Sequence, residues 1–448
     1  MDNPHGILIF GASGSGTTTI GRELARLLDY EHHDIDDYVW EPTNPPYTIE
    51  RSIDERVALL RTAIKGNFVL SGCLREWGGA FDSILSVAAF VKTPTSVRQE
   101  RLNKRELGRY GERINPGGDL YQRHQKFMQY IASYDTGGME TRSLASQGAW
   151  AKTLTCPVVN VNGEDDYRKT AKILRKRLRL MKYAQTAKET VRITDTGIYI
   201  ANDKPVDISE KIAYTNNHTV FISQQDADKL ESEYAPKSGL PIIELHDEST
   251  LAAIIRLADT GKNLGALNFA SAKNPCGGFL KGAMAQEESL AAASALYPAQ
   301  LKATTYYAVN RRYESFTYTD SAIWSPDVVF FRDDNANLLP NPVTSSVLTI
   351  PGVNYKEVIK HGEDTAKAKA AMKRRMKIAL AIFANKGCDT IILGAFGCGV
   401  FQNAPADVAT WWSDLLHEYG GHFEKIVFSV LDRSRKKATY SAFSKILT

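Results

Sequence analysis

Hydrophobic positions in the first 180 residues alternate between short continuous runs and helical stripes. An apolar run at residues 7–10 predicts a strand, and apolar side chains at helical spacing predict a helix over residues 18–28. Similar signals predict strands at residues 67–70, 86–91 and 157–161 and a helix over residues 165–182. Strands that alternate with helices indicate a parallel sheet with helices on both faces.

The pattern changes at residues 183–190, where we expect a short linker. Short strands are predicted beyond it, at residues 191–193, 197–200 and 206–208. Strand and helix patterns then alternate again around a loop-rich segment at residues 300–345. The clearest elements are helices over residues 364–385 and 406–418 and strands over residues 390–393 and 426–431. The sequence therefore predicts two α/β domains, residues 1–182 and 183–448.

The composition fits two intracellular globular domains. The 448 residues are long enough for two domains, and no apolar run approaches the ~18 residues of a membrane-spanning helix. Five cysteines without paired spacing favour reduced thiols and a cytoplasmic location over a disulfide framework or a zinc site. The net charge of +4 neither requires nor excludes nucleic acid. The basic residues Arg175, Lys176, Arg177 and Arg179 are interpreted as a solvated helix face.

A glycine-rich run lies between the first predicted strand and helix, the context of a phosphate-binding loop. It consists of Gly11, Ala12, Ser13, Gly14, Ser15, Gly16, Thr17 and Thr18. Glycines let backbone N–H groups close round a phosphate, and the helix dipole favours the anion. Thr18 stands where a hydroxyl holds magnesium, but Thr17 stands where such a loop has its lysine, which weakens the case for phosphoryl transfer. We expect this domain to bind ATP with Mg²⁺.

Other parts of a small-molecule kinase follow the loop. Asp34 and Asp36 are candidates to hold magnesium or an acceptor hydroxyl. A window resembling a mobile lid contains Arg98, Arg101, Arg105, Arg109 and Arg113. Arginines there either replace the missing lysine charge or form an exposed helix surface. With these features, residues 1–180 resemble P-loop kinases of the adenylate and shikimate kinase type, apart from Thr17.

A second chemical signal lies in the predicted C-terminal domain. The segment 267–278 (LNFASAKNPCGG) is followed after seven residues by Gln286, Glu287 and Glu288, and a second glycine-rich loop (GAFGCGVF) occupies residues 394–401. Such loops at strand ends place backbone N–H groups around a diphosphate. Glutamates beside them suit glycosidic cleavage, where a carboxyl protonates the departing oxygen and then activates water.

These motifs resemble the signature of poly(ADP-ribose) glycohydrolases, a glycine triplet followed by QEE. The longer context resembles the microbial type, a catalytic branch of the macrodomain fold, and residues 318–320 and 325–328 are also similar to that family. The resemblance implies a macrodomain-like α/β/α fold for residues 183–448. It also implies poly(ADP-ribose) or an ADP-ribosylated target as substrate, which leaves ADP-ribosylated nucleic acid open, and it implies no metal in this domain.

The same resemblance implies roles for individual residues. Glu288 is the general acid and base, Glu287 orients the ribose hydroxyls, and Gln286 helps to set the loop. Asn268 or Asn274 contacts the terminal ribose, and the two remain alternatives. Phe401 packs against that ribose. The other residues implied in ADP-ribose binding are Cys276, Gly277, Gly278, Gly397, Cys398, Gly399 and Val400.

Cys276 replaces the first glycine of the triplet, so its Cβ either alters how the loop closes or is tolerated in β-region geometry. This departure keeps two other functions open. One is a reader that binds ADP-ribose without hydrolysing it, beside an ATP-responsive N-terminal domain. The other is a kinase with an ADP-ribose sensor, and tethering suggests an ADP-ribose-derived or nucleoside hydroxyl as its acceptor.

Overall fold

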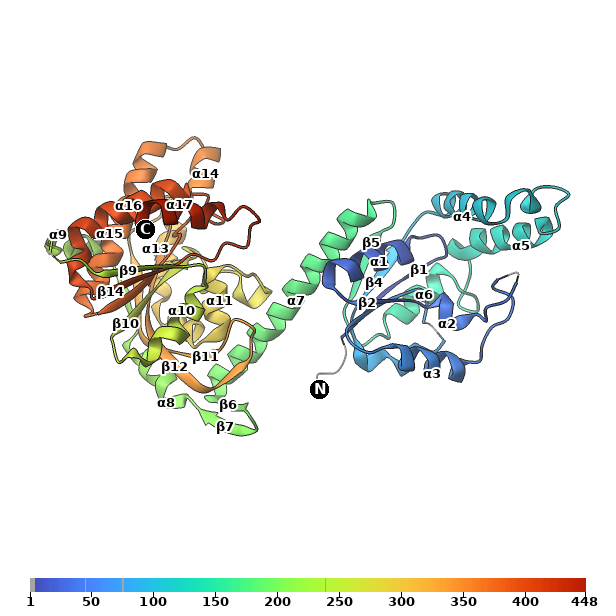
Figure 1. Cartoon of the computed structure of the whole chain (residues 1–448), viewed down its shortest axis with the longest axis horizontal. Helices are drawn as coiled ribbons and strands as arrows, with labels where there is room; N and C mark the ends of the chain where they lie inside the picture. Colours follow the sequence, from blue (N-terminus) through green and yellow to red (C-terminus); the bar gives the residue numbers. More distant parts are fainter. Residues whose placement is uncertain (1–4, 45, 75, 238) are drawn as a thin grey trace. The chain divides into compact units, whose positions relative to one another are not determined.

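The computed structural model describes residues 5–44, 46–74, 76–237 and 239–448. The chain divides into two compact units, Met1–Arg179 and Leu180–Thr448 (Figure 1). The boundary expected from the sequence, between residues 182 and 183, lies within one helical turn of this division. No helix in the described part of the chain is long and apolar enough to cross a membrane.

The N-terminal unit is built on a five-stranded parallel sheet in the order β2-β3-β1-β4-β5. Its strands are β1 (Gly6–Gly11), β2 (Glu31–Asp34), β3 (Phe68–Ser71), β4 (Leu85–Lys92) and β5 (Val158–Asn162). Its helices are α1 (Thr17–Leu28), α2 (Asp36–Val39), α3 (Ile53–Ala63), α4 (Thr95–Tyr110), α5 (Tyr121–Ala132) and α6 (Leu144–Ala151). The strands and first helix predicted for this unit are confirmed.

Both faces of this sheet are covered. Every residue of β1 is buried, as expected for a central strand of a parallel sheet. Helix α1 packs on β1 and β3 through Ile20 and Leu24 on one face. On the other face Leu60 of α3 and Phe81 join a core with side chains of β1, β3 and β4. Because the strands are parallel, the loops after β1, β2 and β3 meet at one edge.

Helix α7 (Tyr167–Thr196) corrects the predicted linker and the predicted strand at residues 191–193. Val191 and Ile193 have strand propensity, but Ala187, Thr190 and Thr194 are buried at helical spacing. The helix continues to Thr196 and ends at Gly197, which has a φ of 73°. The Gly197 N–H donates to the Ile193 carbonyl, as is typical of a glycine that caps the C-terminus of a helix. The tertiary burial pattern therefore overrides local propensity here.

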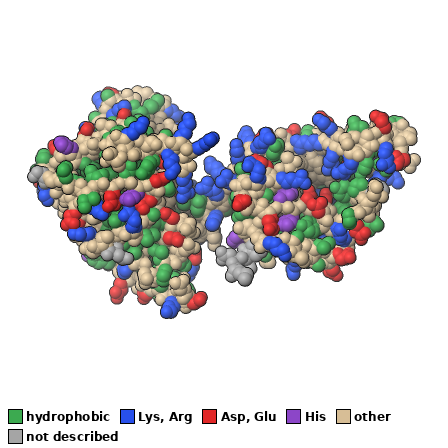
Figure 2. All heavy atoms as spheres, in the orientation of Figure 1, with side chains coloured by type: hydrophobic (Ala, Val, Ile, Leu, Met, Phe, Trp, Pro, Cys, Tyr) green, Lys and Arg blue, Asp and Glu red, His purple; other side chains and the backbone are tan. Residues whose placement is uncertain are grey.

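The basic residues of α7 are exposed, as interpreted from the sequence: Arg175, Lys176, Arg177 and Arg179 all lie at the surface. Lys and Arg side chains gather over the part of the view where α7 lies (Figure 2).

The C-terminal unit contains a mixed seven-stranded sheet in the order β8-β11-β12-β10-β13-β14-β9, and a separate hairpin. The hairpin is β6 (Ile198–Ala201) and β7 (Lys204–Asp207), and the sheet strands are β8 (Val220–Ile222), β9 (Ile242–His246), β10 (Leu264–Ala270), β11 (Ala322–Arg332), β12 (Leu338–Pro351), β13 (Thr390–Leu393) and β14 (Lys425–Ser429). The helices are α8 (Ser209–His218), α9 (Gln224–Glu233), α10 (Thr250–Leu257), α11 (Gln286–Ala293), α12 (Leu296–Gln300), α13 (Thr304–Arg312), α14 (Tyr355–Lys360), α15 (Thr365–Asn385), α16 (Pro405–Tyr419) and α17 (Ala438–Leu447).

The expectation of a loop-rich segment at residues 300–345 is wrong. This segment holds α13, all of β11 and the first half of β12. The two long strands pair antiparallel, with irregular register after Ser325 and after Phe330. Those interruptions, together with the turn residues between the strands, break the alternation that would have identified them from sequence.

The central strands are hydrophobic on both faces. In β13, Ile391 and Leu393 join the core formed with α15, α16 and α17. Ile392 between them faces the opposite core, which contains residues of α10 and α11. The alternation places helical layers on the two sides of the sheet, which confirms the α/β class.

Candidate functional site

The loop after β1 has the backbone of an anion-binding turn. Gly14 and Gly16 have φ values of 80° and 94°, a region in which only glycine is unstrained. The Ser15 N–H donates to the Ala12 carbonyl, whereas those of Ser13, Gly14 and Gly16 have no partner among the described residues. These N–H groups lie at the start of α1, where the helix dipole favours an anion.

Two predicted magnesium-site residues are in contact. The Thr18 hydroxyl donates to Asp34 Oδ2 at 2.9 Å, which places two hard oxygen ligands side by side. Asp36 lies next to them, and its N–H donates to Asp34 Oδ1. Removal from water and the Asp34 charge raise the pKa of Asp36, while the guanidiniums of Arg142 and Arg105 lower it.

The arginines of the predicted lid differ in what their side chains contact. A Cβ placed on Gly16 would lie 3.8 Å from Arg101 Nη1, so Arg101 reaches the loop. Arg105 and Arg109 both lie 3.6 Å from Glu106, and Arg109 also stacks over Tyr47. Two further arginines have structural contacts: Arg98 is fully buried with Asp135, and Arg113 pairs with Asp119.

Sequence reasoning missed Arg142. Its Nη2 donates to the Gly11 carbonyl at 3.0 Å, and Gln147 Nε2 approaches the same oxygen at 3.4 Å. Both residues follow α5 and contact the loop only through the fold, so no spacing in the sequence marks them.

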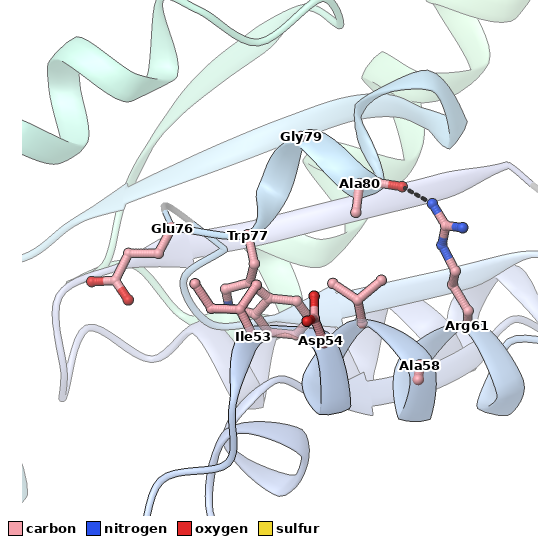
Figure 3. Close-up of a pocket in the computed structure, with 9 residues that line it drawn as sticks. Ile53, Asp54, Ala58, Arg61, Glu76, Trp77, Gly79 and Ala80 are labelled. Carbon is pink, nitrogen blue, oxygen red and sulfur yellow. Dashed lines mark hydrogen bonds between the residues drawn. The ribbon is translucent and has the colours of Figure 1, made fainter.

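A hollow of about 620 Å³ in the N-terminal unit lies between α3 and the segment 76–80 (Figure 3). Ile53 and Asp54 line one side and Trp77 the other, and Arg61 donates to the Ala80 carbonyl across it. None of the residues predicted to bind nucleotide or ADP-ribose lines this hollow.

In the C-terminal unit, three parallel strand ends bring the predicted loops together. β10 pairs with β12 and with β13, and Ala270 at the end of β10 lies beside Pro351 at the end of β12. Phe269 and Phe396, from the two loop regions, have ring centroids 5.6 Å apart. The QEE segment opens α11, whose first residues face β10.

Glu288 is held by backbone donors at both of its oxygens. The Gly278 N–H donates to Oε1 at 2.9 Å, and the Ala285 N–H donates to Oε2 at 3.0 Å. A Cβ on Gly277 would lie 2.5 Å from Glu288 Oε1 and 3.1 Å from Glu287 Oε2. The glycine is therefore required because both carboxylates press against the backbone at this point.

Glu287 is the more deeply buried of the pair. Its carboxylate accepts hydrogen bonds from the Ser271 N–H at 2.7 Å, Asn268 Nδ2 at 3.2 Å and Gln300 Nε2 at 3.4 Å. Burial raises the pKa of Glu287 to about 8, and these hydrogen bonds oppose the shift. A carboxyl that titrates in this range can both accept from and donate to a sugar hydroxyl.

The other polar residues near the pair differ in what they contact. Gln286 accepts from the Phe269 N–H and donates to the Leu267 carbonyl, so it fastens α11 to β10. Asn268 is fully buried, and its Oδ1 has no partner among the described residues. Asn274 is exposed, and its carbonyl accepts from the Gly277 N–H. Of the two asparagines, Asn268 is the one that is hydrogen-bonded to Glu287.

Cys276 does not have β-region geometry. Its φ is 49°, and its side chain is fully buried in the core beside α10 and α11. Its N–H donates to Gln300 Oε1 at 2.6 Å, which fixes the strained turn. Burial raises the thiol pKa of Cys276, and it raises that of Cys398 to about 12, so neither has the character of a nucleophile.

The second loop keeps its N–H groups available. Those of Gly399, Val400 and Phe401 have no partner among the described residues, and Val400 is 73% exposed. Gly397 has a φ of 72°, and Asn403 closes the loop by donating to the Gly397 and Val353 carbonyls. Near this loop, Phe401 and Tyr318 have ring centroids 6.3 Å apart.

Family comparison agrees with this geometry. Residues 187–333 match the profile of the family described as "Microbial-type PARG, catalytic domain". A solved poly(ADP-ribose) glycohydrolase from Thermomonospora curvata is 34% identical, with a TM-score of 0.57 over 59% of this chain and 99% of that chain. The chain belongs to the microbial-type poly(ADP-ribose) glycohydrolase family. A second such glycohydrolase, from Deinococcus radiodurans in complex with ADP-ribose, is 39% identical, with a TM-score of 0.51 over 53% of this chain and 96% of that chain.

The N-terminal unit of this glycohydrolase-family chain has a family match of its own. Residues 7–115 match the profile of an "AAA domain", in agreement with the P-loop kinase-like resemblance. The chain is also 38% identical over 162 residues to YqaC of Bacillus subtilis (strain 168), described as an uncharacterized protein, which corresponds to 36% of this chain and 88% of YqaC.

Sequence reasoning also missed residues that support the glycohydrolase site. Gln300 is fully buried and links the Cys276 N–H to Glu287. Thr349 accepts from both Asn268 and Gln300. Arg375 donates to the Tyr318 and Pro351 carbonyls. Their spacing carries no local signal, because each comes from a different element of the sheet or its helices.

Proposed function

We propose that the C-terminal unit hydrolyses the glycosidic bond of ADP-ribose in poly(ADP-ribose) or in an ADP-ribosylated target. The observation that carries this proposal is the pair of glutamates pressed against Gly277 and held by backbone donors. The family relationship supports the reaction class, because its members with solved structures are glycohydrolases by name.

In this proposal Glu288 is the general acid and base. It would protonate the departing ribose oxygen and then take a proton from the attacking water. The N–H groups of Gly278 and Ala285 hold its two oxygens, so the carboxyl needs little reorganisation during the reaction. Its neighbour Glu287 would orient the ribose hydroxyls, a role supported by its raised pKa and its three donors.

The two glycine-rich loops of this unit would have different roles in binding the ligand. The N–H groups of the first loop are engaged within the protein, by Gln300 at Cys276, by Asn274 at Gly277 and by Glu288 at Gly278. The unengaged N–H groups of Gly399, Val400 and Phe401 therefore suit the diphosphate. Phe401 would pack against the terminal ribose, and the unpartnered Oδ1 of Asn268 would accept from it.

We further propose that the N-terminal unit binds ATP with Mg²⁺. The free N–H groups of the loop after β1 would hold the phosphates, and the Thr18 hydroxyl and Asp34 would hold the ion. Bound Mg²⁺ would neutralise charge on the phosphate oxygens. Asp36 would accept the proton of an acceptor hydroxyl, a role supported by its raised pKa.

The test of the glycohydrolase is release of free ADP-ribose by the full chain from poly(ADP-ribose) and from a mono-ADP-ribosylated peptide. Release from either one supports the proposal and identifies the preferred linkage. Binding of ADP-ribose without release from either substrate contradicts hydrolysis and favours the reader.

A further inference from the structure

The phosphate loop of the N-terminal unit lacks its lysine, and a guanidinium from a distant part of the chain contacts that loop. Thr17 stands at the lysine position and carries no charge. Arg142 lies just before α6, and its Nη2 donates to the Gly11 carbonyl at 3.0 Å. Since Gly11 is the first residue of the loop, the guanidinium is anchored where the phosphate-binding turn begins.

The protein satisfies this guanidinium only in part. Arg142 Nε is buried and has no hydrogen-bond partner among the described residues. The hydroxyl of Ser15, in the loop that Arg142 contacts, is also buried and has no partner in the described part of the chain. An orphaned buried donor is costly and calls for a ligand or a water molecule. Two such groups at one loop point to a polar ligand bound there.

The lid arginines are less suited to this position. Arg105 and Arg109 share Glu106, and the side chain of Arg98 is buried against Asp135. Arg101 approaches Gly16 from α4, but no hydrogen bond joins it to the loop within the described residues. Among the described residues, Arg142 is therefore the arginine whose side chain is hydrogen-bonded to the loop.

We propose that Arg142 supplies the positive charge on the nucleotide phosphates that a lysine at position 17 would otherwise provide. The inference rests on the proposed binding of ATP to this loop. A guanidinium suits the role because it stays protonated and presents several N–H donors in a planar fork that matches phosphate oxygens. The range of the AAA-domain match, residues 7–115, does not include Arg142.

The test is calorimetric titration of the full chain with ATP and Mg²⁺. We expect Arg142→Gln and Arg142→Ala to weaken ATP binding roughly 10- to 100-fold, because both variants lose one charge-assisted contact with the phosphates. Arg142→Lys should weaken binding less, because lysine keeps the positive charge. Arg142→Gln is the sharper variant, since it keeps an N–H donor for the Gly11 carbonyl but has no charge. Arg26→Ala, which removes an exposed arginine that pairs with Glu23 at the C-terminal end of α1, is the matched control and should bind ATP like the parent.

A rescue variant separates charge from structure. Thr17→Lys added to Arg142→Gln should recover most of the lost ATP affinity, because it returns a cation to the same phosphates from another position. If the double variant binds as weakly as Arg142→Gln, or if Arg142→Gln binds ATP as tightly as the parent, the inference is wrong. Failure of the parent itself to bind ATP would instead contradict the proposed nucleotide site. Thermal unfolding of each variant confirms that it is folded, and Arg142→Gln replaces Arg142→Ala if the latter is not.

Discussion

The two units each place a glycine-rich loop after a buried parallel strand, but they use it in opposite ways. In the N-terminal loop the N–H groups of Ser13, Gly14 and Gly16 have no hydrogen-bond partner within the described part of the chain, and the Arg142 side chain donates to the Gly11 carbonyl. In the C-terminal loop the N–H groups of Cys276, Gly277 and Gly278 are all engaged, one of them by Glu288. A glycine pattern at a strand end therefore predicts a tight turn, whereas the partner of its N–H groups depends on the surrounding fold.

The difference separates a binding loop from a positioning loop. Free N–H groups at a helix N-terminus are suited to an anion that arrives and leaves. N–H groups bonded to the protein's own carboxylates hold those carboxylates in one orientation. In the glycohydrolase unit it is the second loop that has N–H groups without a partner among the described residues, at Gly399, Val400 and Phe401. We expect changes in the positioning loop to affect catalysis and stability most strongly.

The largest effect is expected on the pH dependence of stability, through Glu287. Its folded-state pKa is about 8, above the usual 4.5 of an unfolded glutamate. The folded state therefore holds an extra proton between these values, and stability falls as pH rises through that window, by up to about 5 kcal/mol. Urea unfolding of the C-terminal unit at pH 5 and pH 8 measures this fall. Glu287→Gln should remove most of it, and an identical pH dependence in the variant would contradict the burial argument.

Gly277→Ala should reduce ADP-ribose release by about 100-fold or more. A Cβ there would lie 2.5 Å from Glu288 Oε1, and a carboxyl displaced by about 1 Å loses rate on this scale. The φ of 58° adds backbone strain. Gly387→Ala is the matched control, because it has a φ of 69° and open space around its Cβ. Equal activity losses in the two variants would contradict this argument, because they would attribute the loss to backbone strain at a positive φ and not to the contact between the new Cβ and Glu288.

Asn268→Ala should cost about 1 to 3 kcal/mol of stability and weaken ADP-ribose binding, because it removes a buried partner of Glu287 and Thr349. Asn274→Ala should change both quantities little, since the side chain is exposed. Thermal unfolding and ADP-ribose titration of both variants make the comparison. A larger effect at Asn274 would move the ribose contact to that residue.

The smallest effect is expected at Asp34, the last residue of β2, which accepts a hydrogen bond from Thr18 beside the binding loop. Asp34→Asn removes a negative ligand from the pair with Thr18 and should weaken Mg²⁺-dependent ATP binding by roughly tenfold. The same variant should bind ATP normally in the absence of Mg²⁺. Titration with and without the ion measures both, and an equal loss in the two conditions would indicate a structural role.

Strand and helix existence could be predicted where the hydrophobic period was clear, as in β1, β4, β13 and α15. The prediction failed at residues 191–193, where β-branched residues sit in a helix because Ala187, Thr190 and Thr194 face the core. It failed again at residues 300–345, where irregular register hides two long strands. In both places tertiary packing determines the secondary structure, and the local pattern of hydrophobic residues carries no information about that packing.

The candidate site shows the same division. The sequence motifs predicted Glu287, Glu288 and the loop at residues 394–401 as site residues. They could do so because the two glutamates are adjacent in the sequence and the loop resembles a family motif. Gln300 and Thr349, which hold Asn268 and Glu287, and Arg142, which contacts the phosphate loop, come from distant elements. Their roles arise only when the strands and helices are assembled, so the sequence alone gave no signal for them.

The most direct test of the account is Glu288→Gln, compared with the parent chain for both ADP-ribose release and ADP-ribose affinity. Glutamine keeps the shape of the side chain and one oxygen acceptor for the two backbone donors, but it cannot transfer the proton. We expect release to fall by about 10²- to 10⁴-fold while ADP-ribose binding stays within a few-fold of the parent. Release at the parent rate would contradict the assignment of Glu288 as the general acid and base.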